Sequence, residues 1–147
     1  MYSHLLVPID GSPLSQHAID SAIGLAQKLQ ARITAFVAEP PPPTPQPGYG
    51  AAGYLRRVEA HERETDHHAS HLLQDFERRA KEAGVAFEGC TTHTGAIVET
   101  IVTVAAERHC DLIVMATHVH GWFAEVLGTS NTKGVMARTK VPLLVLH

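Results

Sequence analysis

The chain has 147 residues, of which 44% are hydrophobic and 18% charged, so it has the length of one domain and a composition that argues against disorder. Its formal net charge of -3 argues against a surface that binds DNA, RNA or anionic lipid. Residues 1–10 lack the basic start and the apolar length of a signal peptide, and no stretch approaches the roughly 20 apolar residues that span a bilayer. We therefore expect a cytoplasmic protein with neither a nucleic acid nor a membrane as partner.

The apolar segments alternate with segments of helical periodicity. The apolar run at residues 4–10 predicts a strand buried on both faces, and Ser12 and Pro13 suit the N-cap and the first position of the helix that follows. The elements expected in chain order are strands over 4–10, 31–38, 85–92, 111–117 and 141–147, and helices over 13–30, 54–83 (ended by Gly84), 95–108 and 129–139.

This alternation predicts a doubly wound α/β fold, with a five-stranded, mostly parallel sheet and helices on both faces. The pairing direction of the last strand stays open. We expect a single domain over residues 1–147. The proline-rich segment that follows the second strand is a loop within this domain and not a linker, because the second strand needs neighbouring strands on either side of it.

A loop rich in proline and glycine is expected at residues 40–53. Its proline run, Pro40 to Pro47, can neither extend a sheet ladder nor begin a helix easily. Residues 48–53 spell G-x-G-x-x-G, but the dinucleotide fingerprint requires a strand directly before that pattern. We interpret this motif as a flexible loop.

The sequence Gly128-Thr-Ser-Asn-Thr-Lys133 opens the last expected helix. A first helical turn carries free backbone N–H groups and the positive end of the helix dipole, which together attract an anion. Gly128 allows close approach, and Thr129, Ser130 and Asn131 add hydroxyl and amide groups. Two interpretations stay open here: a phosphate site, or a hydroxyl that simply caps the helix.

Both ends of the chain resemble the universal stress protein family. The resemblance rests on Leu6-Val-Pro-Ile-Asp-Gly-Ser12, on Met115-Ala-Thr-His-Val-His-Gly-Trp-Phe-Ala-Glu-Val-Leu-Gly-Thr129 and on Lys140-Val-Pro-Leu-Leu-Val-Leu146. It implies the Rossmann-like fold of the adenine nucleotide alpha hydrolase type. It also implies a stress-response module that binds ATP, ADP or AMP, with Mg²⁺ as a candidate companion ion, without efficient turnover.

The glycine motif of the family, G-x2-G-x9-G-S/T, is altered in this chain. Ala116 and Val119 stand where the first two glycines are expected, and eight residues, not nine, separate Val119 from Gly128. Gly121 is a candidate displaced substitute. The intervening loop also carries two histidines and two large aromatic side chains, which the family loop usually avoids: His118, His120, Trp122 and Phe123.

The resemblance also implies the residues of the nucleotide site. Asp10 would contact the ribose or the base, Val37 would pack near the adenine, and Gly128, Thr129 and Ser130 would hold phosphates. The alternative roles are a turn former or cap for Asp10 and plain core for Val37 and Met115. The full candidate set is Pro8, Ile9, Asp10, Val37, Met115, Ala116, Thr117, His118, Gly121, Gly128, Thr129, Ser130 and Asn131.

Two other functions stay open. One is a dimeric interaction or signalling adaptor that has lost the glycine loop and binds no nucleotide, and the other is a slow ATP hydrolase, for which no base is identifiable.

The family commonly forms homodimers through the final strand, and the short apolar strand at 141–147 would offer an edge for self-pairing. We therefore expect a homodimer through these residues.

Histidines and cysteines complete the candidates. His61, His67, His68 and His71 cluster on one expected helix, where a solvated helix face is favoured over a metal site. Cys90 and Cys110 do not form a CxxC pair, so we expect free, buried thiols in a reducing compartment, with a disulfide as the less favoured alternative.

Overall fold

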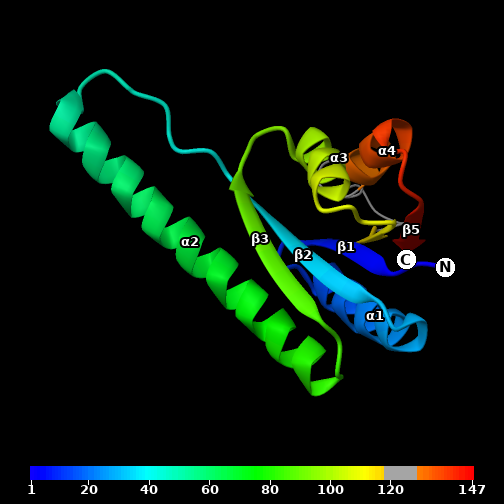
Figure 1. Ribbon diagram of the computed structural model, residues 1–147. Helices are drawn as coiled ribbons and strands as arrows, with labels where there is room; N and C mark the ends of the chain where they lie inside the picture. Colours follow the sequence, from blue (N-terminus) through cyan, green and yellow to red (C-terminus); the bar gives the residue numbers. More distant parts are fainter. Residues whose placement is uncertain (118–128) are drawn as a thin grey trace.

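A five-stranded sheet forms the centre of the molecule, and every pair of neighbouring strands is parallel. The structure, a computed structural model, describes residues 1–117 and 129–147. The strand order is β3-β2-β1-β4-β5 (Figure 1). The elements are β1 His4–Ile9, α1 Pro13–Leu29, β2 Arg32–Glu39, α2 Gly50–Glu82, β3 Phe87–His93, α3 Ile97–Glu107, β4 Leu112–Ala116, α4 Thr129–Arg138 and β5 Leu143–Leu146.

The predicted fold class is confirmed, and each predicted strand is present with bounds that differ by at most two residues. The last strand, β5, pairs with β4 in parallel, so the sheet is parallel throughout the described residues. Among the described helices, none combines the length and the apolar character that a membrane crossing requires.

The three central strands, β1, β2 and β4, are buried on both faces because helices cover both sides of the sheet (Figure 1). Successive side chains of a strand point to opposite faces. Leu5 and Val7 of β1 therefore pack in one apolar cluster with α1 and α2, whereas Leu6 packs in a second cluster with α3 and α4. The continuous apolar run of β1 is thus explained by two separate cores, one on each side of the sheet.

The start of α1 follows the prediction. The Ser15 amide donates a hydrogen bond to Ser12 Oγ at 3.3 Å, and Pro13 occupies the first helical position, where its missing N–H costs nothing.

The end of α2 also follows the prediction. Gly84, two residues after the last residue of α2, has φ +71°, the left-handed conformation that terminates a helix with little steric cost.

The long helix α2 begins earlier than the sequence predicted. Its first residue is Gly50, not residue 54, so the loop predicted over 40–53 ends at Tyr49, and the last four of the six residues of the G-x-G-x-x-G motif are helical. The interpretation of that whole motif as a flexible loop was wrong. Residues 51 and 52 are both alanine, the best helix former, and no proline follows, so the helix extends backwards over the two glycines at 50 and 53.

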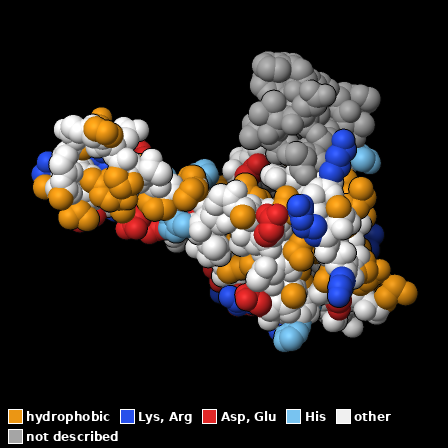
Figure 2. Space-filling view, turned by 90° about the horizontal axis from the view of Figure 1, so that it is seen from above, with side chains coloured by type: hydrophobic (Ala, Val, Ile, Leu, Met, Phe, Trp, Pro, Cys, Tyr) orange, Lys and Arg blue, Asp and Glu red, His pale blue; other side chains and the backbone are white. Residues whose placement is uncertain are grey.

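Only the C-terminal half of α2 is packed against the sheet. Its buried residues are Ala69, Phe76 and Ala80, and the Phe76 ring packs edge-on against Phe87 of β3 with centroids 5.1 Å apart. The N-terminal half projects away from the sheet (Figure 1). Figure 2 shows hydrophobic side chains gathered on this projection, where Leu55 is 58% exposed.

Both cysteines are free thiols, as expected; Cys110 is buried, whereas Cys90 is only half-buried. Burial raises the pKa of Cys110 to about 11 and also raises the pKa of Cys90. At neutral pH both side chains are therefore protonated, and they behave as small apolar groups, not as nucleophiles.

Candidate functional site

The order of the strands reverses between β1 and β4. The chain moves from β1 to β2 and β3 on one side and later to β4 and β5 on the other. In open α/β sheets, ligands bind beyond the carboxyl ends of the strands at such a switch point. The β1–β4 ladder pairs Leu5 with Leu112 and Leu6 with Ile113 and ends before Pro8, which has no N–H to donate.

A cavity of about 430 Å³ lies at the carboxyl ends of β1 and β2. Its apolar wall comes from β2, and its acidic groups come from the turn after β1, from the end of β2 and from α2. The lining includes Asp10, Val37, Ala38, Glu39, Glu64 and His68. A pocket of this size and mixed character suits a small organic molecule with several hydrogen-bond donors.

A second cavity, of about 640 Å³, lies at the opposite ends of the strands. Ser3, Gln30 and Val85 are among the residues that line it. It is larger, but it faces the amino ends of the strands, where ligands of parallel sheets do not bind. The smaller cavity is therefore the candidate site.

Asp10 occupies a constrained turn directly after β1. Its Oδ1 accepts hydrogen bonds from the Ser12 amide at 2.9 Å and from Ser15 Oγ at 2.6 Å. Partial desolvation raises the pKa of Asp10, but the hydrogen bonds together lower it by more, so the pKa of Asp10 lies below its ordinary value. Asp10 is therefore an anion at neutral pH, and its carboxylate has acceptor capacity left for a ligand.

Gly11 makes this turn possible. Its φ of +81° is a conformation that residues with a side chain rarely adopt, and a Cβ atom at this position would come within 3.1 Å of Leu72 Cδ2 on α2. The turn that presents Asp10 thus lies directly beneath α2.

The predicted residues of β1 and β2 lie side by side. Ile9 and Val37 are register partners at the carboxyl ends of their strands, and both are buried, whereas Pro8 is half-buried. Val37 belongs to the core that faces α1 and α2, and it also lines the cavity. The two alternatives left open for Val37, core and cavity wall, therefore describe the same side chain.

The predicted residues of β4 lie at the carboxyl end of that strand. Met115 is buried on the α3 and α4 side, and Ala116 is half-buried. Thr117 follows the strand and is buried; its amide donates to the Leu146 carbonyl, and its Oγ1 has no hydrogen-bond partner among the described residues. A buried hydroxyl without a partner is uncommon and marks this strand end as a position where a ligand could bind.

The remaining predictions concern the loop before α4 and the start of that helix. His118, Gly121 and Gly128 lie outside the described residues, as do Val119, His120, Trp122 and Phe123. Helix α4 begins at Thr129, so the predicted start of this helix is confirmed. Ser130 lies in its first turn, and Asn131 is half-buried. A phosphate on this turn stays a prediction.

Sequence reasoning missed the contribution of α2 to the cavity. Glu64, Thr65 and His68 line it because α2 runs alongside β3, which brings its residues 64–68 next to the carboxyl end of β2. His68 belongs to the histidine cluster that we interpreted as a solvated helix face. A helical period shows which residues share a face, but it does not show which strand that face will meet.

Within the described residues, one group of three side chains has the spacing of metal ligands: Glu39, Asp66 and His93. It does not include His61, His67, His68 or His71. The sequence analysis named none of the three as candidates, since they come from three different elements.

With this geometry established, comparison with known proteins assigns the family. A profile described as "Universal stress protein family" matches residues 1–147. The chain belongs to the universal stress protein family. The match spans the whole sequence, including the region where the glycine motif is altered.

Individual relatives agree with this assignment. Universal stress protein C of Escherichia coli K12 is 27% identical over 146 residues, which cover 99% of this chain and 95% of the relative. A solved structure of a protein from the universal stress protein family of Burkholderia pseudomallei is 27% identical and has a TM-score of 0.75. The alignment covers 99% of this chain and 96% of that protein. A universal stress protein solved in complex with cAMP is 26% identical, has a TM-score of 0.66 and covers 99% of this chain, with 97% of its own length covered.

Proposed function

We propose that this universal stress protein is a cytoplasmic stress-response module that binds an adenine nucleotide (ATP, ADP or AMP) without efficient turnover. The observation that carries the proposal is the cavity at the carboxyl ends of β1 and β2, which both Asp10 and Val37 line. The cytoplasmic location is supported by the two free cysteines, since thiols stay reduced in that compartment.

The cavity offers complementary chemistry for a nucleoside. Val37 and Ala38 supply apolar surface against which the flat face of a base can pack. The ionised carboxylate of Asp10 can accept hydrogen bonds from the hydroxyl groups of a ribose. A nucleoside in this position would contact both the buried end of β2 and the turn after β1.

The phosphates would extend toward the start of α4. The first turn of a helix presents unpaired N–H groups and a positive dipole, and α4 begins at Thr129 in the segment that follows β4. Gly128, Thr129, Ser130 and Asn131 are the proposed phosphate contacts. Mg²⁺ would accompany the phosphates, because it binds phosphate oxygens together with water.

Similarity to a nucleotide-bound relative supports the proposal. The relative solved with cAMP carries an adenine nucleotide and aligns over 99% of this chain at 26% identity. The altered glycine motif separates this chain from the pattern of the nucleotide-binding members, so a direct binding measurement is required.

The test is a thermal unfolding series with ATP, ADP and AMP, each with and without Mg²⁺, and with Mg²⁺ alone as a control. A nucleotide present at 100 times its Kd should stabilise the native state by about 2.7 kcal/mol. Asp10→Asn keeps the shape of the side chain but removes its charge, and it should reduce the shift. Glu77→Gln makes the same chemical change on the exposed surface of α2 and should leave the shift unchanged.

Two other outcomes point to the alternative functions. If no nucleotide changes the unfolding temperature of the native chain, the proposal fails and the non-nucleotide-binding adaptor is favoured. If ATP binds and phosphate is released at a rate that depends on the concentration of this protein, the module is a slow ATP hydrolase.

A further inference from the structure

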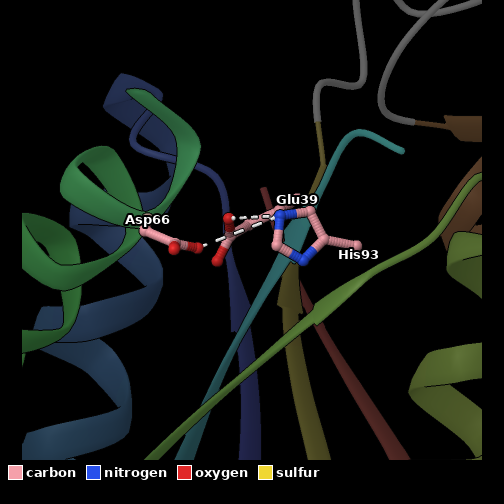
Figure 3. A group of neighbouring side chains, drawn as sticks. All are labelled: Glu39, Asp66 and His93. Atoms are coloured by element: carbon pink, nitrogen blue, oxygen red, sulfur yellow. Dashed lines mark ion pairs between the residues drawn. The ribbon is translucent and has the colours of Figure 1, made fainter. Parts of the chain in front are cut away.

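We propose that Glu39, Asp66 and His93 form a binding site for a divalent transition-metal ion, with Zn²⁺ as the best match. The three residues come from β2, α2 and β3, respectively, and their side chains point toward one another (Figure 3). One ligand atom from each residue lies within 4.8 Å of the other two. The site does not depend on the nucleotide proposal.

The sheet itself brings two of the ligands together. Glu39 and His93 are register partners at the carboxyl ends of adjacent strands, so their side chains lie next to each other on one face. The backbone continues this pairing, since the Thr94 amide donates to the Glu39 carbonyl at 2.9 Å. Both strand ends are therefore held in place before any ion binds.

Helix α2 supplies the third ligand from above the strands. His93 Nε2 lies 3.1 Å from Glu39 Oε2 and 3.9 Å from Asp66 Oδ1. Zinc–ligand bonds of about 2.0–2.2 Å in a tetrahedron place the ligand atoms about 3.3–3.6 Å apart. Both observed distances lie within a few tenths of an ångström of that range, so small side-chain rotations would complete the geometry.

Glu39 provides the independent evidence for a ligand. Its side chain is only 3% exposed, and neither carboxylate oxygen has a hydrogen-bond partner among the described residues. Removing an ionised carboxylate from water without hydrogen bonds is costly, and a bound cation is one of the few ways to offset that cost. Glu39 Oε2 lies 3.1 Å from His93 Nε2, a contact that is an ion pair only when the imidazole is protonated. With a neutral imidazole, a cation bound between these two atoms would supply the missing charge.

The other two ligands leave a route for the ion. The side chain of His93 is 35% exposed and that of Asp66 is 65% exposed, so the site opens to solvent on the α2 side. Thr65 Oγ1, next to Asp66, lies 3.2 Å from His93 Nε2. When the ion occupies Nε2, this hydroxyl would hydrogen-bond to a metal-bound water instead. Water would complete the coordination of the ion.

The donor set indicates the class of metal. An imidazole nitrogen is a preferred ligand of Zn²⁺ and other late transition metals, whereas Mg²⁺ and Ca²⁺ prefer oxygen alone. Two carboxylates balance the charge of a dication when the histidine is neutral. An ion in this position would link α2 to the ends of β2 and β3, and it would lie beside the candidate nucleotide cavity, to whose wall Glu39 also contributes.

The decisive experiment is calorimetric titration of the nucleotide-free, full-length protein with Zn²⁺, and separately with Mg²⁺. We expect one Zn²⁺ per chain at this site and much weaker binding of Mg²⁺. His93→Ala and Asp66→Asn remove exposed or half-exposed ligands and should fold normally, and each should weaken Zn²⁺ binding by at least about tenfold. Zn²⁺ should also raise the unfolding temperature of the native chain but not that of His93→Ala.

The exposed histidines of α2 supply the matched control. His67 and His71 are one helical turn apart on the solvent-facing surface and could bind Zn²⁺ adventitiously. The double variant His67→Ala/His71→Ala should retain the site. Zn²⁺ affinity that survives in His93→Ala and Asp66→Asn, or that disappears in the double variant, would overturn the assignment, as would the absence of Zn²⁺ binding to the native chain.

Discussion

Gly134 of α4 lies directly against Val98 of α3: a Cβ atom placed on Gly134 would come within 2.8 Å of Val98 Cγ2. Real Cβ atoms essentially never approach a neighbour so closely, so the absence of a side chain at position 134 lets the two helices pack. The contact lies on the side of the sheet covered by α3 and α4, where Val135 is fully buried.

Replacing this glycine should therefore destabilise the protein. Gly134→Ala gains about 1 kcal/mol of helix propensity, but we expect an overpacking cost of about 1–3 kcal/mol against the stiff, β-branched Val98. Chemical denaturation measures the balance. Gly24→Ala is the control, because nothing lies within 4 Å of a Cβ at that position in α1, and it should stabilise by about 0.5–1 kcal/mol. Equal effects of the two substitutions would contradict the packing argument.

Stability should also fall as the pH is lowered below about 6.5, because of His4. This side chain is 3% exposed, and its Nε2 lies 2.7 Å from Thr34 Oγ1. Burial lowers the pKa of His4 from its ordinary value of 6.5, and the nearby positive charge of Arg32 lowers it further. The unfolded chain therefore binds a proton at His4 more readily than the folded chain does. The contribution of the neutral His4 to stability is fully present above pH 6.5 and is lost as the pH falls through the pKa of His4 in the folded state.

Denaturant unfolding at a series of pH values measures this dependence. His4→Gln cannot take up the proton, and its free energy of unfolding should decline less between pH 6.5 and pH 5 than that of the native chain. His17 is exposed on α1, so His17→Gln should preserve the native slope. A native slope that persists in His4→Gln would assign the pH dependence to other groups.

The cysteines should be unreactive in the folded state. Cys110 is 6% exposed with its pKa raised to about 11, and the Cys90 thiol donates to the Ala35 carbonyl at 3.6 Å. Thiol-disulfide reagents attack thiolates, so both should react slowly at pH 7.5 and at full rate in denaturant. Rapid labelling of Cys110 under native conditions would show that this part of the core opens locally.

The strand β5 lies at one edge of the sheet, and we expect it to mediate homodimerisation. Leu144 in its middle is 37% exposed, an apolar side chain on an open edge. Leu144→Lys adds a charge there and should convert a dimer into a monomer in light scattering at micromolar concentration. Leu55→Lys makes the same change on the projecting half of α2 and should not alter the mass. A native chain that is already monomeric would end this proposal.

Sequence patterns determined the succession of elements. The apolar run of β1, the Ser12 cap and Gly84 each act through local chemistry that needs no distant partner, which is why the predicted starts of β1 and α1 and the glycine stop after α2 agree with the structure. The predicted start of α2 was wrong because two local signals in this segment disagree. The glycines at 50 and 53 resembled a loop, although the alanines between them favour a helix that extends to Gly50.

Tertiary packing decided which side chains meet. The resemblance to a family suggested Asp10 and Val37, but the cavity that they line is completed by Glu64 and His68, whose position depends on how α2 lies across the strands. Likewise, Glu39 and His93 are 54 residues apart and become neighbours only through the register of β2 with β3. Local periodicity specifies the face of an element, whereas the partner of that face is set by the packing of the whole core, which no short stretch of sequence contains.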